Sequence, residues 1–310
     1  MYAYFIVNPN SGSGNGQKVW ERTEGYLKSS GIRYEVAFTT GRGDAERIAS
    51  GLSSGKSFHD AHMIVVIGGD GTVNEALNGL DLESGMLFGF IPGGSGNDLS
   101  RSLGISNDDL EHTKSMLSGE NILEMDIGEL SLPDGRVRRF AVSAGINFDA
   151  AVCEHIDRSK LKSFFNKIGC GTFVYGAIGF IEYLKTVLLP CTVTDDSGKK
   201  YEFQSTFFAS FQVHPFEGGG FRFAPKAKWN DGKLELCVTH AKNRLELAPV
   251  LLQGKGKNGL PAGTVATFIS TSHAGIRFPA ECCVHSDGEV LGHYSGFEAR
   301  CMKEKLRMPV

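Results

Sequence analysis

The sequence lacks the features that mark disulfide-rich, zinc-binding and nucleic-acid-binding proteins. Its seven cysteines show no regular CxxC spacing, so they imply neither a disulfide framework nor a zinc site. A reducing compartment is therefore favoured. The formal net charge of -3 provides no overall basic field, so nucleic acid is not expected as a partner.

The sequence also lacks a long uninterrupted apolar run and a typical signal peptide. The N-terminal segment MYAYFIVNPNSG has no basic region and only a short apolar run, which predicts a first strand. The longest apolar stretch, residues 173–189, contains Glu182 and Lys185 and is too interrupted to span a bilayer. We therefore expect a soluble, cytoplasmic protein.

Glycine is abundant, and its most informative cluster is GGDGTVNE at residues 68–75. The cluster follows the apolar run 63–67, which predicts a buried strand. Its glycines would allow positive φ and close approach of a ligand, and the N–H groups of the next helix would face an anion. Asp70 adds a carboxylate suited to a metal ion or a polarised hydroxyl. An ordinary turn, with Asp70 and Thr72 capping the helix, is the alternative.

The first part of the chain, residues 1–126, alternates strand and helix signals. Strands are expected at 3–7, 33–39, 63–67 and 88–91, with helices at 16–29, 44–53 and 72–80. This alternation predicts a parallel sheet whose ligands bind beyond the carboxyl ends of the strands. Three glycine-rich turns, at 8–16, 68–71 and 93–96, follow strands and should converge on that edge.

The second part of the chain is rich in strand signals from about residue 127. Strands are expected at 129–132, 138–144, 191–194, 202–211, 234–239, 265–271 and 282–285. We therefore predict an α/β domain over 1–126 and a β domain over 127–295, with a helical insertion at about 153–189. The C-terminal segment 296–310 is expected to return to the first domain.

Several acidic residues near turns could take part in chemistry. The turn at 91–98 ends in Asp98, and phosphoryl transfer needs carboxylates that hold Mg²⁺. Asp287 lies in VHSDGE and is either part of a hairpin turn or a general base that takes a proton from a hydroxyl. Asp149 is either another acid of the site or a solvated loop acid.

Together these segments resemble the diacylglycerol kinase catalytic-domain family, in its bacterial lipid-kinase branch. The matching segments, in family order from residue 8 to residue 289, are NPNSG, GGDGTVNEALNG, IPGGSGNDLSR, SAGINFDAAV, EGGGFRFAPKAKWNDGKLEL and SDGE. GGDGT is shared with NAD kinases and, loosely, phosphofructokinases, whereas the turn at 92–98 and the late DGE make the resemblance specific. It implies a doubly wound α/β nucleotide domain of the NAD-kinase and phosphofructokinase type and a β-sandwich lipid domain, joined across a cleft.

The resemblance also implies roles for individual residues. The residues matched to ATP binding are Asn8, Pro9, Asn10, Ser11, Gly12, Thr39, Gly68, Gly69, Asp70, Gly71, Thr72, Glu75 and Ser95. Asp287 matches the catalytic base, with Glu289 beside it, and Asp98 and Asp149 match acids that organise metal and water. A structural Mg²⁺ loop is implied at the side chain of Asp231 and the carbonyls of Lys228 and Lys233. This loop departs from the family at Trp229 and Lys233, which backbone ligation tolerates.

The implied activity is ATP- and Mg²⁺-dependent phosphorylation of a lipid hydroxyl at a bilayer surface. The alternatives are a kinase similar to NAD kinase and a non-catalytic nucleotide- or lipid-binding regulator. Basic residues around apolar ones at 158–167 indicate either a membrane-surface helix or a solvated helix with a core face. Residues 173–189 would line an acyl pocket or form an ordinary buried helix. A homodimer is possible from the sequence. The residues do not indicate which lipid is the substrate.

Overall fold

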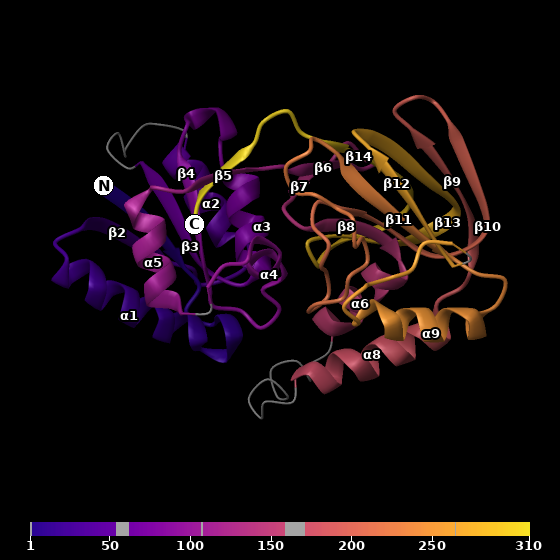
Figure 1. Ribbon diagram of the computed structural model, residues 1–310, viewed down its shortest axis with the longest axis horizontal. Coiled ribbons are helices and arrows are strands. Elements are labelled where there is room, and N and C mark those ends of the chain that lie inside the picture. The colour runs from indigo at the N-terminus through magenta and orange to yellow at the C-terminus, as the bar shows by residue number, and fades with distance from the viewer. Residues whose placement is uncertain (1, 54–61, 107, 159–170, 264) are drawn as a thin grey trace. The chain divides into compact units, whose positions relative to one another are not determined.

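The computed structural model describes all residues except 1, 54–61, 107, 159–170 and 264, and it divides into two compact units (Figure 1). Unit 1 contains residues 1–127 and 303–310, and unit 2 contains residues 128–302. The returning segment is shorter than the expected 296–310. The reason is that strand β14 (Glu289–Cys301) pairs with β13 and β6 of unit 2 along this stretch.

Unit 1 is built on a parallel sheet of four strands, as predicted. The strands are β1 (Tyr2–Val7), β2 (Arg33–Phe38), β3 (Met63–Gly68) and β4 (Leu87–Pro92), in the order β2-β1-β3-β4. All six residues of β3 are buried, which explains why its sequence is continuously apolar. Val7, Ile67 and Ile91 are aligned across the sheet near the carboxyl ends of their strands.

Helices cover both faces of this sheet (Figure 1). They are α1 (Asn15–Ser29), α2 (Asp44–Ser53), α3 (Asp70–Gly79), α4 (Asp98–Leu103) and α5 (Asp109–Ser118). Helices α1 and α5 share an apolar core with Phe5 and Val65. Ile6 is buried on the opposite side of β1, where α2 and α3 pack against each other and against the sheet. The doubly wound prediction is confirmed.

The C-terminal segment is attached to unit 1 by a short antiparallel ribbon. Strand β15 (Leu306–Pro309) pairs with β5 (Ile122–Met125). Lys305 forms an ion pair with Asp126, whose side chain is fully buried. A buried carboxylate needs such a partner, so this contact fixes the chain end to the unit.

Unit 2 is a β-sandwich, as predicted, and the part of it that the structure describes also contains three helices. Its further strands are β6 (Gly128–Ser131), β7 (Val137–Phe140), β8 (Ser143–Asn147), β9 (Leu189–Asp195), β10 (Lys200–Gln212), β11 (Leu234–His240), β12 (Ala266–Thr271) and β13 (His273–Ser286). The helices are α6 (Phe148–Arg158), α8 (Gly171–Lys185) and α9 (Arg244–Gly254). The single strand predicted at 138–144 is wrong, because β7 ends at Phe140 and β8 begins at Ser143.

The two long strands β10 and β13 close the sandwich. The first part of each strand pairs with β9, and the last part of each pairs with β8. Register shifts occur along both strands: between Thr206 and Phe208 of β10 in its ladder with β11, and between Arg277 and Cys282 of β13 in its ladder with β14. Such irregularities let a strand bend from one layer into the other. The apolar core between the layers includes Phe211, Ile276 and Phe297.

The helical insertion is less buried than expected at the end of α8. Its basic stretch 159–167 lies outside the described residues. The expectation of an ordinary buried helix is wrong for the end of α8, where Phe180 is 62 % exposed and Leu184 is 52 % exposed. Within the described ranges, no helix combines the length and the apolarity needed to cross a membrane.

Candidate functional site

The three glycine-rich turns of unit 1 meet at one edge of the sheet, as predicted. The Gly93 N–H donates a hydrogen bond to the Gly68 carbonyl at 2.6 Å. A Cβ added to Gly12 would lie 2.4 Å from the Gly93 carbonyl oxygen, and one added to Gly94 would lie 2.5 Å from the Gly69 Cα. The backbones of the turns are therefore in direct contact, and side chains are excluded between them.

Close packing, and not positive φ, requires glycine at Gly68 and Gly69 of the central turn. Gly68, Gly69 and Gly71, all of them described, are absent from the residues with positive φ, and Gly69 is extended with φ -102° and ψ -178°. A Cβ on Gly68 would lie 2.7 Å from the Thr72 Cβ. The expectation of positive φ is therefore wrong here, and α3 begins at Asp70 instead of Thr72.

Asp70 caps the helix of the neighbouring turn. Its carboxylate accepts hydrogen bonds from the N–H groups of Asp98, at 3.3 Å, and Leu99, at 3.5 Å, at the start of α4. A carboxylate at a helix N-terminus compensates unpaired N–H groups and the positive end of the helix dipole. Asp70 is therefore a helix-capping residue, as the alternative predicted. The helix that it caps is α4 and not α3, the helix that begins at Asp70 itself.

Asn8 joins the first turn to the second. Its Nδ2 donates to Thr72 Oγ1 at 3.1 Å, and its Oδ1 accepts from the Asn10 N–H at 3.1 Å. Ser11 Oγ donates to the Asn8 carbonyl at 2.9 Å. The NPNSG segment is therefore held by its own polar side chains in a fixed shape at the sheet edge.

Thr39 and Glu75 have different positions relative to this edge. Thr39 follows β2, is buried, and donates its N–H to the Val7 carbonyl at the end of β1, at 2.8 Å. Glu75 Oε2 accepts from the Ala45 N–H at 3.2 Å and so connects α3 to the start of α2. Thr39 therefore lies at the sheet edge where the three turns meet. Glu75 instead contacts the start of α2, a helix that covers the sheet.

The third turn contains a buried amide oxygen that was not anticipated, and two carboxylates lie near its Gly96. Asn97 adopts a left-handed conformation with φ 52°, and its buried Oδ1 has no hydrogen-bond partner. A Cβ on Gly96 would lie 3.0 Å from Asp70 Oδ2 and 3.9 Å from Asp98 Oδ2. Asp98 also forms an ion pair with Arg101. Carboxylate oxygens such as those of Asp70 and Asp98 are ligands that Mg²⁺ prefers.

Asp287 lies in the hairpin turn between β13 and β14. Its φ of 47° and the φ of 82° at Gly288 match a type I′ turn, so the hairpin alternative is correct. The carboxylate also accepts three backbone hydrogen bonds, from Ala141 at 2.7 Å, Val142 at 2.8 Å and Ser143 at 2.9 Å. These three N–H groups fix the orientation of the carboxylate at the hairpin turn. Its role as a base remains a prediction.

Asp149 is buried and forms part of a polar cluster in unit 2. His285 Nε2 lies 3.3 Å from Asp149 Oδ2 and 3.2 Å from Glu217 Oε1. The Ala150 N–H donates to Asp149 Oδ1 at 2.8 Å, at the start of α6. The alternative of a solvated loop acid is therefore wrong. Burial raises the pKa of Asp149 to about 6, although its hydrogen bond to His285 opposes this shift.

His285 connects this cluster to the turn that carries Asp287. The Gly288 N–H donates to His285 Nδ1 at 3.1 Å, which places the ring proton on Nε2, facing the carboxylates. His285 and Glu217 were not predicted; the only signal for His285 is its position two residues before Asp287.

The loop with Asp231 has the oxygen chemistry of a cation site. Asp231 is exposed, and its Oδ1 accepts from the Lys233 N–H at 3.1 Å around Gly232, whose φ is 75°. Burial raises the pKa of Glu235, and the negative charge of Asp231 adds to this shift. Two carboxylates therefore share this corner of unit 2. Ligation by the Lys228 and Lys233 carbonyls stays a prediction.

Comparison with known proteins divides the chain in the same way as its two units. Residues 2–130 match the model of the diacylglycerol kinase catalytic domain. Residues 141–308 match the YegS C-terminal NAD kinase beta sandwich-like domain. The two matches together cover both units and nearly the whole chain.

Relatives of similar length carry kinase names. A Bacillus subtilis (strain 168) protein with the provisional name lipid kinase YtlR is 28 % identical over 93 % of this chain and 93 % of its own length. A Staphylococcus aureus (strain MRSA252) diacylglycerol kinase is 27 % identical over 83 % of this chain and 76 % of its own length. A crystal structure of a Bacillus anthracis (strain Sterne) diacylglycerol kinase shares the fold, with a TM-score of 0.72 at 21 % identity over 99 % of this chain and 96 % of that one.

Proposed function

Because this chain belongs to the bacterial diacylglycerol kinase and lipid kinase family, we propose that it transfers the γ-phosphate of ATP to a lipid hydroxyl in the presence of Mg²⁺. The observation that carries this proposal is the contact of three glycine-rich turns at one sheet edge, with Asp70 and Asp98 on either side of Gly96. Exposed backbone N–H groups and nearby carboxylates are the groups that bind phosphates together with a metal ion.

The phosphates of the nucleotide would bind at the sheet edge where the three glycine-rich turns meet, because the glycines there present no side chains. Asn8 and Thr72 hold the first two turns together, and Asp70 holds the third turn through the start of α4. This fixed geometry supports binding of phosphates without rearrangement of the backbone. Thr39 lies at the same edge, at the end of β2, where it could contact the rest of the nucleotide.

A magnesium ion, when bound, would neutralise charge on the phosphates. Asp70 of the second turn and Asp98 of the third would hold it through their carboxylates, and Asn97 of the third turn offers a further amide oxygen. The loop at Asp231 would hold a second, structural ion through its carboxylate and backbone oxygens.

The proton of the lipid hydroxyl would pass to Asp287. Three backbone N–H groups orient its carboxylate, which would take the proton as a general base. His285 would keep the turn in place through Gly288, because its other ring nitrogen is held by two carboxylates. Asp149 therefore supports the base through His285 in this proposal, and Glu289 stands beside it at the start of β14.

The proposed lipid substrate requires a membrane surface, and α8 and α9 offer an apolar face suited to one. Along α8 and just beyond it, Phe180, Leu184 and Val187 are 52 % to 62 % exposed. On α9, Leu245 is 83 % exposed and Leu252 is 79 % exposed. Exposed apolar side chains on helices, with cations nearby, favour adsorption to an anionic bilayer.

The two helices that carry these side chains are directly connected. Arg244, at the start of α9, donates to the Thr186 carbonyl at 2.7 Å and to the Leu184 carbonyl. Tyr183 donates to the Arg244 carbonyl. Arg244 places a positive charge beside the apolar side chains, and the exposed Lys185 adds one that is paired with Glu182. These contacts support treating α8 and α9 as one docking face.

A direct test is phosphate transfer from labelled ATP by the purified protein. The acceptor panel contains diacylglycerol, ceramide, a sphingoid base and phosphatidylglycerol in mixed vesicles, together with NAD as a soluble rival acceptor. We expect Mg²⁺-dependent labelling of one lipid class and none of NAD. Labelling of NAD without any lipid would assign the chain to the alternative activity, and nucleotide binding without transfer would favour a regulator.

A further inference from the structure

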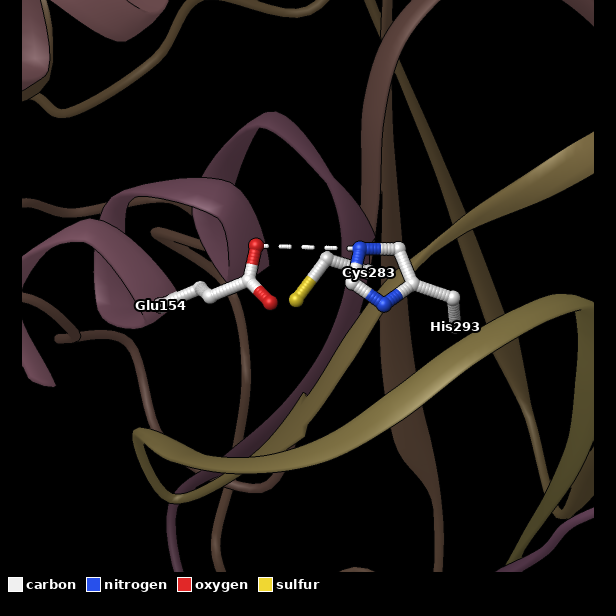
Figure 2. Close-up of side chains that lie close together, drawn as sticks. All are labelled: Glu154, Cys283 and His293. Atoms are coloured by element: carbon white, nitrogen blue, oxygen red, sulfur yellow. Dashed lines mark ion pairs between the residues drawn. The ribbon is translucent and has the colours of Figure 1, made fainter. Parts of the chain in front are cut away.

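A carboxylate, a thiol and an imidazole meet in unit 2 at a place that the kinase reaction does not use. They belong to Glu154 of α6, Cys283 of β13 and His293 of β14, and one ligand atom from each lies within 4.8 Å of the others. Figure 2 shows the three groups turned toward one another. We propose that these residues form a zinc site. This inference does not depend on the proposed function.

The β13–β14 ladder brings two of the three ligands together. Cys283 and His293 are direct partners in the antiparallel register, so their side chains lie on the same face of the hairpin. Helix α6 packs on both strands at this face. Cys283 Sγ contacts the Ala150 carbonyl at 3.4 Å, and Glu154 lies one helical turn beyond Ala150.

The distances in the cluster suit a metal ion better than a direct hydrogen bond. His293 Nε2 and Glu154 Oε2 are 3.6 Å apart, which is beyond normal hydrogen-bond length. A tetrahedral zinc ion with bonds of about 2.0–2.3 Å holds its ligand atoms roughly 3.5 Å apart. Small movements of the side chains would therefore place the nitrogen, oxygen and sulfur around one ion, with a fourth position for water.

A fourth residue holds the carboxylate in the orientation that such a site needs. Arg158 Nη2 donates to Glu154 Oε1 at 2.8 Å, and this leaves Oε2 directed at the imidazole. Outer groups that orient a ligand in this way are typical of metal sites. His293 is 46 % exposed, so an ion can arrive from solvent, whereas Cys283 forms the buried end of the site.

Binding would exchange the thiol proton for the metal ion. The Cys283 S–H, which points to the Ala150 carbonyl, would lose its proton to solvent, and the sulfur would form the bond to Zn²⁺. The Ala150 carbonyl lies within α6 and keeps its helical backbone partner. The ion would thus connect α6 to both strands of the hairpin.

A second cluster of potential ligands in the described part of the chain consists of Asp149, Glu217 and His285. In that cluster the imidazole Nε2 already lies at hydrogen-bond distance from both carboxylates, and all three residues are buried. It also contains no sulfur. A sulfur-specific signal therefore distinguishes the proposed site from it.

The test is titration of the tag-free, reduced protein with Co²⁺ and then Zn²⁺. We expect one equivalent of Co²⁺ to produce a thiolate-to-cobalt charge-transfer band, which Zn²⁺ abolishes. Cys283→Ser should remove the band, and His293→Asn or Glu154→Gln should weaken Zn²⁺ binding more than about 100-fold. Arg158→Gln should weaken it about 10-fold, because it only orients Glu154.

Two matched controls should leave both signals unchanged. Cys282→Ser removes the adjacent thiol, which points into the sandwich core. His273→Asn removes an imidazole on the same ladder that lies 3.5 Å from Glu298 with no thiol beside it. Zn²⁺ should also raise the melting temperature of the wild type and of Cys282→Ser, but not of Cys283→Ser. A cobalt band that survives Cys283→Ser, or equal Zn²⁺ affinity in all variants, would overturn the proposal.

Discussion

Asp287 and Ser143 are joined by two hydrogen bonds of opposite direction. The Ser143 N–H donates to Asp287 Oδ1 at 2.9 Å, and the Asp287 N–H donates to the Ser143 carbonyl at 2.8 Å. The side chain proposed as the base is therefore also a structural link between the β13–β14 turn and the start of β8. Any substitution at this position affects both properties, so activity alone cannot identify its role.

Asp287→Asn is expected to abolish phosphate transfer and also to destabilise unit 2. An asparagine has one amide group where the carboxylate has an oxygen, so it would face at least one of three backbone N–H donors. Leaving a buried donor without an acceptor costs about 1–3 kcal/mol. Denaturant unfolding measures this loss, and transfer assays are then made where the variant stays folded.

The required control for Asp287→Asn is nucleotide binding at the same temperature. Unit 1 does not contain Asp287, so ATP affinity should stay within about twofold of the wild type. Transfer that persists in a folded, ATP-binding variant would remove Asp287 from the role of base. Loss of ATP binding would show instead that the substitution acts beyond unit 2.

Gly94→Ala should disrupt the phosphate-binding edge. Its Cβ would lie 2.5 Å from the Gly69 Cα, and a backbone atom cannot move away as a flexible side chain can. A displacement of about 1 Å in a reacting group can lower activity about 100-fold, and we expect a loss of this size with weaker ATP binding. Calorimetric titration with ATP and the transfer assay measure the two effects.

Gly25→Ala is the matched control for Gly94→Ala. Gly25 lies within α1, and its added Cβ would meet no atom within 4 Å. Alanine in a helix interior is more favourable than glycine by up to about 1 kcal/mol, so this variant should be slightly stabilised and fully active. Equal activity of the two variants would mean that the turns tolerate a side chain.

The sequence predicts the layers of the fold better than the contacts of its site. The buried strand 63–67 and the turn after it were placed correctly, because strand and helix periodicity are local properties. The hydrogen-bond partner of Asp70 was not predicted, because α4 begins 28 residues later and only the folded sheet edge brings Asp98 close to Asp70. Glu217 and His285 are likewise far apart in sequence and are joined only by the sandwich.

Substitutions on α8 and α9 should weaken binding to anionic vesicles. Leu184 is 52 % exposed and Leu245 is 83 % exposed, and burial of one leucine side chain contributes about 1.5–3 kcal/mol. Leu184→Asp and Leu245→Asp should each lower the vesicle partition coefficient at least about tenfold. Vesicle sedimentation measures the coefficient, and transfer to a water-soluble short-chain lipid should be retained.

Val137→Asp is the control for the docking face. Val137 lies on β7 of the same unit and is 51 % exposed, so the same change is made at a similar exposure away from both helices. It should leave vesicle binding unchanged. Equal loss in all three variants would indicate a general effect of negative charge, and no loss in any of them would exclude this face as the membrane contact.

The stability of the protein should fall with pH below about 6.5, in part because of His214. This side chain is fully buried, and burial lowers its pKa to about 3. In the unfolded chain the pKa is about 6.5, so below that value the unfolded state binds a proton that the folded state does not. The contribution of His214 is therefore complete above about pH 6.5 and is lost progressively as the pH falls toward 3. Between pH 7 and pH 5 the loss is about 2 kcal/mol.

The variant His214→Asn separates this contribution from all other titrating groups. Because the variant cannot bind the proton, the difference in unfolding free energy between wild type and variant should shrink by about 2 kcal/mol from pH 7 to pH 5. Urea unfolding at the two pH values measures it. His112→Asn should show a change of the same sign, since burial also lowers the pKa of His112, whose Nε2 contacts the Phe90 carbonyl at 2.8 Å. A difference that does not vary with pH would show that His214 takes up its proton in the folded state as readily as in the unfolded chain.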